Sequence, residues 1–118
     1  ILSVKPSEIF ERDENDLYLY VPISFSQAAL GDEVSVPTLE KEVNIKIPIG
    51  TQSGTKFRLS GKGVPHLDGY GRGDIYIIVN VVTPKHFSKE QKKLFEELKK
   101  TEEKKSLLDK IKEFAKFR

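Results

Sequence analysis

The chain of 118 residues contains no cysteine, no methionine and no tryptophan. Without cysteine it can form neither a disulfide nor a thiolate metal site, and it has no cysteine nucleophile. Its two histidines, His66 and His86, have no carboxylate or second histidine at ligand spacing. No apolar run reaches the length of a membrane-spanning helix. We therefore expect no metal, no cofactor, no catalytic site and no membrane partner.

The absence of methionine also bears on where the chain comes from. Because it begins at Ile1 and has no methionine anywhere, we expect it to be a fragment of a longer protein. It opens with no basic segment followed by an apolar stretch, so nothing indicates secretion. High lysine and glutamate content without cysteine is typical of a heat-adapted cytoplasmic protein, and we expect a cytoplasmic location.

Charge is unevenly distributed along the chain. Residues 1–84 carry 8 lysine or arginine against 11 aspartate or glutamate, a net −3, whereas residues 85–118 carry 12 against 7, a net +5. A basic tail could bind nucleic acid through phosphate contacts. Here the lysines are diluted by acidic residues, including Glu96 four positions before Lys100, which is typical of a solvated helix face. We therefore expect no nucleic-acid partner.

Short segments of two-fold apolar alternation predict strands in the first two thirds of the chain. They are Leu17–Val21, Val34–Val36, Val43–Ile47, Phe57–Leu59 and Ile75–Val82. Glycine-rich turn signals between them predict hairpins and a meander. An alanine pair closed by Gly31 predicts one or two helical turns over Phe25–Leu30. The expected fold is mainly β: a small two-sheet β-sandwich with one short helix, followed by C-terminal amphipathic helices.

After Pro84 the period becomes helical. Ser88 and Gln91 predict a capping box for a first helix with a narrow apolar stripe. A second helix is predicted over Ser106–Arg118, with one continuous apolar face. That face consists of Leu107, Leu108, Ile111, Phe114 and Ala115. Isolated helices of this length barely form in water, so the stripe predicts a partner surface. We expect it to join two copies of the chain as a homodimer.

Glycines between Leu59 and Ile75 invite comparison with a phosphate-binding loop. Gly61-Lys62-Gly63 is followed by Val64, so the required spacing with a lysine and a hydroxyl residue is absent. We interpret these glycines as turn residues and the tripeptide Arg72–Asp74 as structural.

Two segments are apolar on both faces. In Leu17–Val21 the leucines alternate with tyrosines, and Ile75–Val82 is apolar almost throughout. One interpretation is a sandwich whose central strands are buried on both sides. The other is an exposed apolar groove that takes an extended peptide.

Long stretches of the chain resemble the second C-terminal domain of the DnaJ (Hsp40) co-chaperones. The matching segments are Ile9–Tyr18, Val21–Val34, Val36–Leu39, Gly54–Val64, Gly73–Tyr76 and Lys105–Lys112. The resemblance covers essentially the whole chain. It implies three parts: residues 1–16 as the end of a preceding domain and linker, 17–84 as the β-rich domain, and 85–118 as a helical dimerisation element. Ile1–Val4 would then pair outside the compact core.

The resemblance also implies a function without catalysis. Such a fragment would bind unfolded or extended apolar polypeptides and dimerise, supporting protein folding with an Hsp70 of the DnaK type. The family's His-Pro-Asp tripeptide, which stimulates Hsp70, is absent, so Hsp70 would engage parts of the protein outside this chain.

Comparison with the family's first client-binding domain implies a client groove between the first two strands. Leu19, Val21, Val34 and Val36 would line it. Two rival hypotheses remain: a purely structural dimerisation module that binds no client, and a nucleic-acid-binding β domain whose association collapses with salt.

Overall fold

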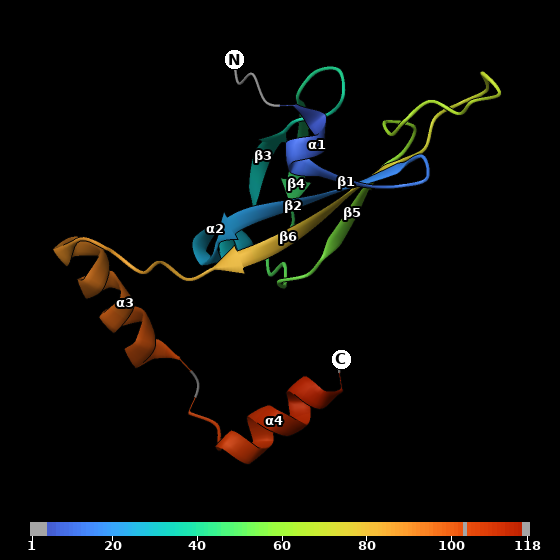
Figure 1. Cartoon of the computed structure of the whole chain (residues 1–118). Coiled ribbons are helices and arrows are strands. Elements are labelled where there is room, and N and C mark those ends of the chain that lie inside the picture. Colours follow the sequence, from blue (N-terminus) through green and yellow to red (C-terminus); the bar gives the residue numbers. More distant parts are fainter. Residues whose placement is uncertain (1–4, 103, 117–118) are drawn as a thin grey trace. The chain divides into compact units, whose positions relative to one another are not determined.

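A computed structural model describes residues 5–102 and 104–116. The chain forms two compact units, Ile1–Pro84 and Lys85–Arg118. The elements of the first unit are α1 (Pro6–Ile9), β1 (Phe10–Asp13), β2 (Asp16–Ser24), α2 (Phe25–Leu30), β3 (Asp32–Val36), β4 (Val43–Ile47), β5 (Lys56–Leu59) and β6 (Ile75–Val82). The second unit holds α3 (Lys89–Thr101) and α4 (Leu107–Ala115) (Figure 1). The predicted fold class is confirmed.

The larger sheet of the first unit has the strand order β1-β2-β6-β5 (Figure 1). Its two longest strands, β2 and β6, run parallel over eight register pairs from Leu17–Ile75 to Ser24–Val82. β1 and β5 add to them in antiparallel fashion at either side. The predicted meander is therefore wrong, because parallel strands need a long connection. Here that connection includes α2, the smaller sheet and β5.

The smaller sheet pairs β3 with β4, and its inner side chains share one core with the larger sheet. Leu17, Leu19, Ile75, Ile77 and Val79 supply the larger sheet's part of that core. Val36, Ile45 and Ile47 supply the part from the smaller sheet. Alternate residues of each strand point to one face, so this packing buries every second side chain.

The remaining side chains of β2 and β6 form the opposite face of the larger sheet, which we call the outer face. Tyr18, Tyr76 and Ile78 are half-buried there, and Tyr20 is 51% exposed. The hypothesis that both central strands are fully buried on both sides is therefore wrong. The outer face is an aromatic and aliphatic surface that reaches solvent.

The helix predicted over Phe25–Leu30 is confirmed as α2. Ser24 caps it: its hydroxyl accepts a hydrogen bond from the Gln27 N–H (3.1 Å), and the Gln27 side chain accepts one from the Ser24 N–H (2.9 Å). This reciprocal pair satisfies two backbone donors that the helix itself leaves free. Gly31 ends the helix with a φ of 80°. A Cβ there would lie 2.9 Å from the carbonyl oxygen of Ile47, so this turn requires glycine.

The sequence pattern did not predict β1, which lies before Leu17. Its burial pattern explains why: only Phe10 is buried, and the three residues after it are charged and exposed. The strand nevertheless pairs along its whole length with β2, from Phe10–Leu19 to Asp13–Asp16. The predicted pairing of Ile1–Val4 lies outside the described residues.

Both predicted C-terminal helices are present. α3 begins after Ser88, whose capping box with Gln91 is confirmed by hydrogen bonds of 3.1 and 2.8 Å. α4 begins after Ser106, whose hydroxyl accepts a hydrogen bond from the Asp109 N–H. In the described part of the chain, no helix is long and apolar enough to cross a membrane.

Candidate functional site

The apolar stripe of α4 lies on the surface of the second unit. Leu107, Leu108, Ile111 and Phe114 are between 54% and 74% exposed, and Ala115 is also exposed. These are the five residues predicted for dimerisation. A nine-residue helix with its apolar stripe in water has little to stabilise it, since most helical stability in proteins comes from packing that stripe. The stripe is therefore available to a partner surface.

α3 carries a second exposed apolar stripe. Leu94 and Leu98 are about half exposed. Phe95 is half-buried and meets Phe87 edge to face, with ring centroids 5.2 Å apart. Edge-to-face contact suits the quadrupoles of two aromatic rings. Phe87 thus packs against the α3 stripe through Phe95. Both helices of the second unit have exposed apolar side chains.

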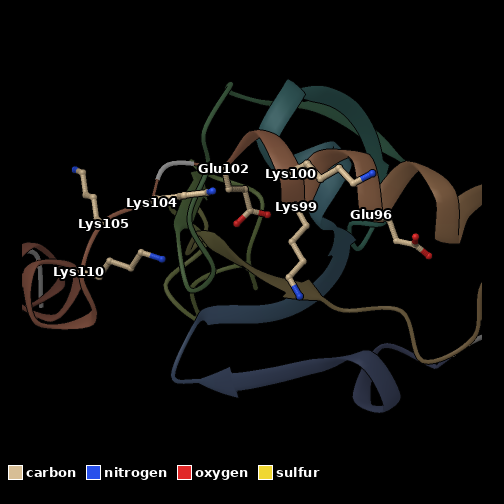
Figure 2. Close-up of a pocket in the computed structure, with 7 residues that line it drawn as sticks. All are labelled: Glu96, Lys99, Lys100, Glu102, Lys104, Lys105 and Lys110. Atoms are coloured by element: carbon tan, nitrogen blue, oxygen red, sulfur yellow. The ribbon is translucent and has the colours of Figure 1, made fainter.

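The hollow beside the end of α3 is lined by charged side chains only. They are Glu96, Lys99, Lys100, Glu102, Lys104, Lys105 and Lys110. Figure 2 shows the amino groups of Lys99, Lys105 and Lys110 pointing in different directions. Lys105 forms an ion pair with Glu113 of α4 at 2.7 Å. The hollow is thus lined by side chains of both signs.

In the first unit, β3 and β4 form a two-stranded sheet, so each of them has one side without a neighbouring strand among the described residues. β3 pairs with β4 from Asp32–Ile47 to Val36–Val43. Backbone N–H and C=O groups along the other side of β3 therefore lack strand partners. Such an edge is a template on which another extended chain can add by main-chain hydrogen bonds.

The four side chains predicted to line a client groove come from two sheets, Leu19 and Val21 from β2 and Val34 and Val36 from β3, and they differ in burial. Leu19 and Val36 are 5% and 1% exposed and belong to the core. Val21 and Val34 are half-buried and pack against that core. Val21 and Val34 thus keep some surface accessible, whereas Leu19 and Val36 do not.

The start of β3 is fixed by hydrogen bonds to Asp32. Its carboxylate accepts one from the Gln27 side-chain amide (3.0 Å) and one from the Glu33 N–H (2.7 Å). The hydrogen bond from Gln27, followed by that from Glu33, lowers the pKa of Asp32 below its ordinary value, against a smaller opposing effect of burial. Because Gln27 also completes the α2 capping box, one side chain links the helix to the edge strand.

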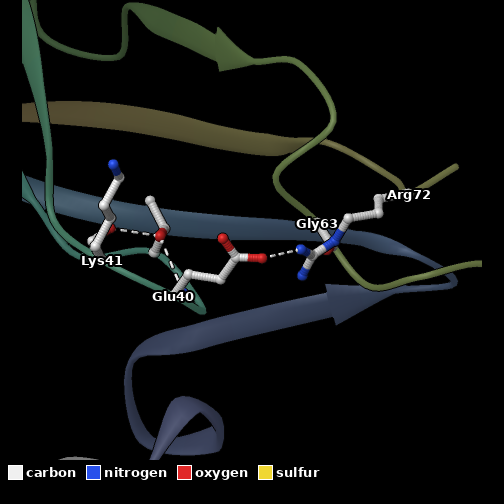
Figure 3. A network of polar contacts seen from close by, with 5 residues as sticks. Glu40, Lys41, Gly63 and Arg72 are labelled. Carbon is white, nitrogen blue, oxygen red and sulfur yellow. Dashed lines mark hydrogen bonds and ion pairs between the residues drawn. The ribbon is translucent and has the colours of Figure 1, made fainter.

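The loop that follows β3 is held in place by Arg72 (Figure 3). The Arg72 guanidinium donates to the Gly63 carbonyl oxygen (2.9 Å) and forms an ion pair with Glu40. Thr38 orders the same loop, since its hydroxyl donates to the Lys41 carbonyl oxygen and accepts from the Glu40 N–H. Sequence reasoning identified Arg72 as structural but did not predict this link. Opposite charges thirty-two positions apart give no local signal.

Asp74 anchors the base of the long loop between β5 and β6. Its carboxylate accepts hydrogen bonds from the Gly61 N–H (2.9 Å) and the Arg58 side chain (2.8 Å). The hydrogen bond from Gly61 lowers the pKa of Asp74 most; burial opposes it, and Arg58 lowers it further. The interpretation of Arg72–Asp74 as a structural tripeptide is confirmed, because both charged side chains are bound within the fold.

The same loop packs against the turn between β1 and β2 with almost no free space. The Asn15 carbonyl oxygen accepts a hydrogen bond from the Val64 N–H (2.9 Å). The Gly63 N–H donates to the Gly73 carbonyl oxygen (2.8 Å). A Cβ on Gly73 would lie 2.0 Å from the Asn15 oxygen, and one on Gly63 2.5 Å from it. These two glycines are needed for close backbone approach.

Metal-ligating residues do not cluster in the part of the chain that the structure describes. No group of three or more histidine, cysteine, aspartate or glutamate side chains there could hold an ion. His66 instead contacts the side-chain amide of Asn15. The described features are thus an open strand edge, an aromatic sheet face and exposed helix stripes, all of which suit binding of polypeptide.

Comparison with known proteins gives this β-rich architecture its class. Residues 1–84 match the family described as DnaJ C terminal domain, and the chain belongs to that family. The class that the fold and the match define is that of the DnaJ-type chaperones. The resemblance noted from the sequence is confirmed.

Three bacterial relatives illustrate the match, each named chaperone protein DnaJ. That of Geobacillus thermodenitrificans (strain NG80-2) is 58% identical over 97 residues, which cover 82% of this chain and 26% of the relative. That of Halalkalibacterium halodurans is 54% identical over the same length. That of Bacillus velezensis is 49% identical over 118 residues, covering 95% of this chain and 32% of the relative. The chain thus spans about a quarter to a third of the relatives' length.

Proposed function

We propose that this chain is the part of a cytoplasmic bacterial DnaJ that holds unfolded polypeptide clients and joins two copies of the protein. Hsp70 of the DnaK type would be engaged by parts of the protein outside this chain. The observation that carries the proposal is the open edge of β3, found in a chain of the DnaJ C terminal domain family. No catalysis or cofactor is involved.

A client segment would add to β3 as a further strand. Its backbone would form hydrogen bonds with the N–H and C=O groups of Asp32–Val36 that have no strand partner, which gives affinity for any sequence. The Glu33 N–H would exchange its hydrogen bond to the Asp32 carboxylate for one to the client. Its alternate side chains would contact Val21 and Val34, which favours apolar residues. Such binding selects extended, apolar chain, which is what an unfolded protein exposes and a folded protein hides.

Dimerisation would bury the stripe of α4. Leu107, Leu108, Ile111 and Phe114 keep half or more of their surface in water. Completing their burial would gain about 4 to 8 kcal/mol gross, since a fully buried side chain of this kind gains roughly 1.5 to 3 kcal/mol. Ordering costs reduce that sum. Two-fold symmetry would present the same stripe from both copies, which makes the interface self-complementary.

Dimerisation and client holding would reinforce one another. A dimer presents two β3 edges to one unfolded chain, so the second contact forms at a high effective concentration. Weak individual edges then give useful avidity. The proposal therefore predicts that a monomeric variant holds clients less tightly than the dimer, even though its β3 edge is unchanged.

Sedimentation tests the dimer. Ile111→Asp places a charge in the α4 stripe, and we expect it to convert the dimer to a monomer at tens of micromolar protein. Lys112→Ala, on the neighbouring exposed position, is the matched control and should stay dimeric. If both the unsubstituted chain and Lys112→Ala sediment as monomers, the proposed dimer is wrong.

Titration with a permanently unfolded protein tests client holding. Val34→Ser removes an apolar contact from β3 without placing a charge against the core, and we expect weaker binding. Ser35→Thr, at an exposed position of the same strand, should bind as the unsubstituted chain does. Absence of binding by a well-formed dimer would favour the purely structural module. The nucleic-acid hypothesis would be favoured if binding is lost as the salt concentration rises and if nucleic acid competes with the unfolded protein.

A further inference from the structure

The outer face of the larger sheet carries an aromatic cluster that neither the client edge nor the dimer stripe uses. Tyr18 and Tyr76 are register partners on β2 and β6, and their rings stack with centroids 5.2 Å apart at 22°. Tyr20 and Ile78 form the next register pair along the same two strands. Solvent-facing positions of an antiparallel or mixed sheet are ordinarily polar, so four such side chains together indicate a binding surface.

The cluster has a positive side chain on its β5 side and a negative side chain on its β1 side. Lys56 of β5 places its ammonium 5.3 Å from the Tyr76 ring centroid and 5.8 Å from that of Tyr18. Among the described residues this ammonium has no carboxylate partner, whereas Arg58 on the same strand is paired with Asp74. Glu11 of β1 lies at the opposite side, as the register partner of Tyr18. A ligand that crosses the strands would thus meet a positive group at β5 and a negative one at β1.

The size of the cluster favours a short segment over a second copy of the chain. Aromatic side chains present roughly 150 to 250 Å² each when fully exposed, and these are about a tenth to a half exposed. With Tyr20 half exposed and the other three half-buried, the accessible cluster is therefore roughly 100 to 400 Å². A stable dimer interface needs about 800 Å² from each partner. The outer face is too small for that and large enough for a few residues of extended chain.

The hydrogen-bonding groups of the outer face indicate which backbone conformation a bound segment would have. At Tyr18, Tyr76 and Ile78 the strands are paired on both sides, so no backbone groups are open to strand addition there; only at Tyr20, where β2 pairs with β6 alone, is one side of the strand unpaired. Over these three residues the hydrogen-bond donors are on side chains, the tyrosine hydroxyls and the Lys56 ammonium. A polyproline II helix has no internal hydrogen bonds and accepts such donors at its carbonyl oxygens, and proline rings pack flat on aromatic rings.

We propose that the outer face of the β1-β2-β6-β5 sheet binds a proline-rich segment in the polyproline II conformation, with an acidic residue placed at Lys56. This site is independent of the client edge of β3 and uses the other face of β2. It would give the protein selectivity for proline-containing stretches that cannot add as strands, because proline lacks the backbone N–H that a strand ladder needs.

Tyrosine fluorescence reads this face directly, because the chain has no tryptophan and three of its four tyrosines lie on it. In a Tyr70→Phe background only Tyr18, Tyr20 and Tyr76 report. The probe is a short peptide of alternating proline and alanine with one glutamate and no aromatic residue. We expect a saturable change in emission that weakens about tenfold or more in a Tyr20→Ser/Ile78→Thr variant. Val34→Ser on the client edge is the matched control and should bind the probe unchanged.

Charge reversal tests the orientation. Lys56→Glu should weaken binding of the glutamate probe and strengthen binding of the same peptide with lysine in its place. Equal binding of a glycine-serine peptide, or full binding by the Tyr20→Ser/Ile78→Thr variant, would overturn the proposal. So would a change of tyrosine emission on Ile111→Asp substitution without peptide, because the face would then be covered by α4. Loss of probe binding with normal client binding would leave the proposed function intact.

Discussion

The close approach between the β1–β2 turn and the long loop before β6 makes Gly73 the most sensitive glycine of the fold. The Gly73→Ala substitution adds one methyl group. That Cβ would lie 2.0 Å from the Asn15 carbonyl oxygen, 2.4 Å from its carbon and 2.8 Å from an Asp16 carboxylate oxygen. Real Cβ atoms essentially never come this close, and two of the three atoms belong to backbone. The loop must therefore move away from the turn.

The cost follows from what that movement breaks. Forcing an extra carbon into a packed site costs about 1 to 3 kcal/mol. Displacement would also weaken one of two hydrogen bonds: that from the Asp74 N–H to the Asp16 carboxylate (2.8 Å) or that from the Val64 N–H to the Asn15 carbonyl oxygen (2.9 Å). Loss of either hydrogen bond costs about 1 kcal/mol. We expect a total of about 2 to 4 kcal/mol. For a domain of this size that lowers the midpoint of thermal unfolding by about 8 to 30 °C.

Urea unfolding followed by circular dichroism and tyrosine fluorescence measures this cost. Gly69→Asn is the control, because nothing lies within 4 Å of a Cβ there and asparagine tolerates the positive φ of 82°. It should change the free energy of unfolding by less than about 1 kcal/mol. A Gly73→Ala protein within about 0.5 kcal/mol of the unsubstituted chain would refute the close approach.

Three further outcomes are expected. Ser24→Ala removes the hydroxyl that caps α2 and should lower the free energy of unfolding by about 1 kcal/mol, measured by the same urea titration, whereas Ser26→Ala should not. The pKa of Asp74 is lower in the folded chain than its ordinary value of 3.8, so its ionised carboxylate stabilises the fold above pH 3.8. This stabilisation is lost as the pH falls from 3.8 through the lower pKa of the folded chain. In Asp74→Asn the free energy of unfolding, measured by urea titration at several pH values, should therefore vary less with pH in that range. Ile111→Asp should abolish the dimer in sedimentation at tens of micromolar and weaken client holding through loss of avidity.

Local signals carried most of the secondary structure. Ser88 and Gln91 lie within one helical turn, so their capping box could be recognised before the structure was known. The equivalent pair Ser24 and Gln27 has the same spacing, and that signal could have placed the start of α2 as well. Both depend on neighbours in sequence, which is why pattern reasoning suffices.

Local sequence patterns could not predict which strands or charged side chains pair over long distances in the sequence. The parallel alignment of β2 with β6 joins residues far apart in the chain, and no turn motif marks it. The same holds for Arg72 and Glu40, whose pairing depends on two separate loops. Apolar alternation indicated which face of β2 is inward but not how deep each residue lies. Leu19 is part of the core, and Val21, two positions on, is only half-buried.

Hydrogen exchange of the backbone amides tests the central claim most directly, because it locates a bound client without any substitution. The full chain is exchanged alone and with a saturating unfolded protein, and protection is compared strand by strand. Strand addition predicts that the amides of Asp32–Val36 that point away from β4 become protected, while those of β4 do not change. Client binding that leaves every β3 amide as it was would contradict the account.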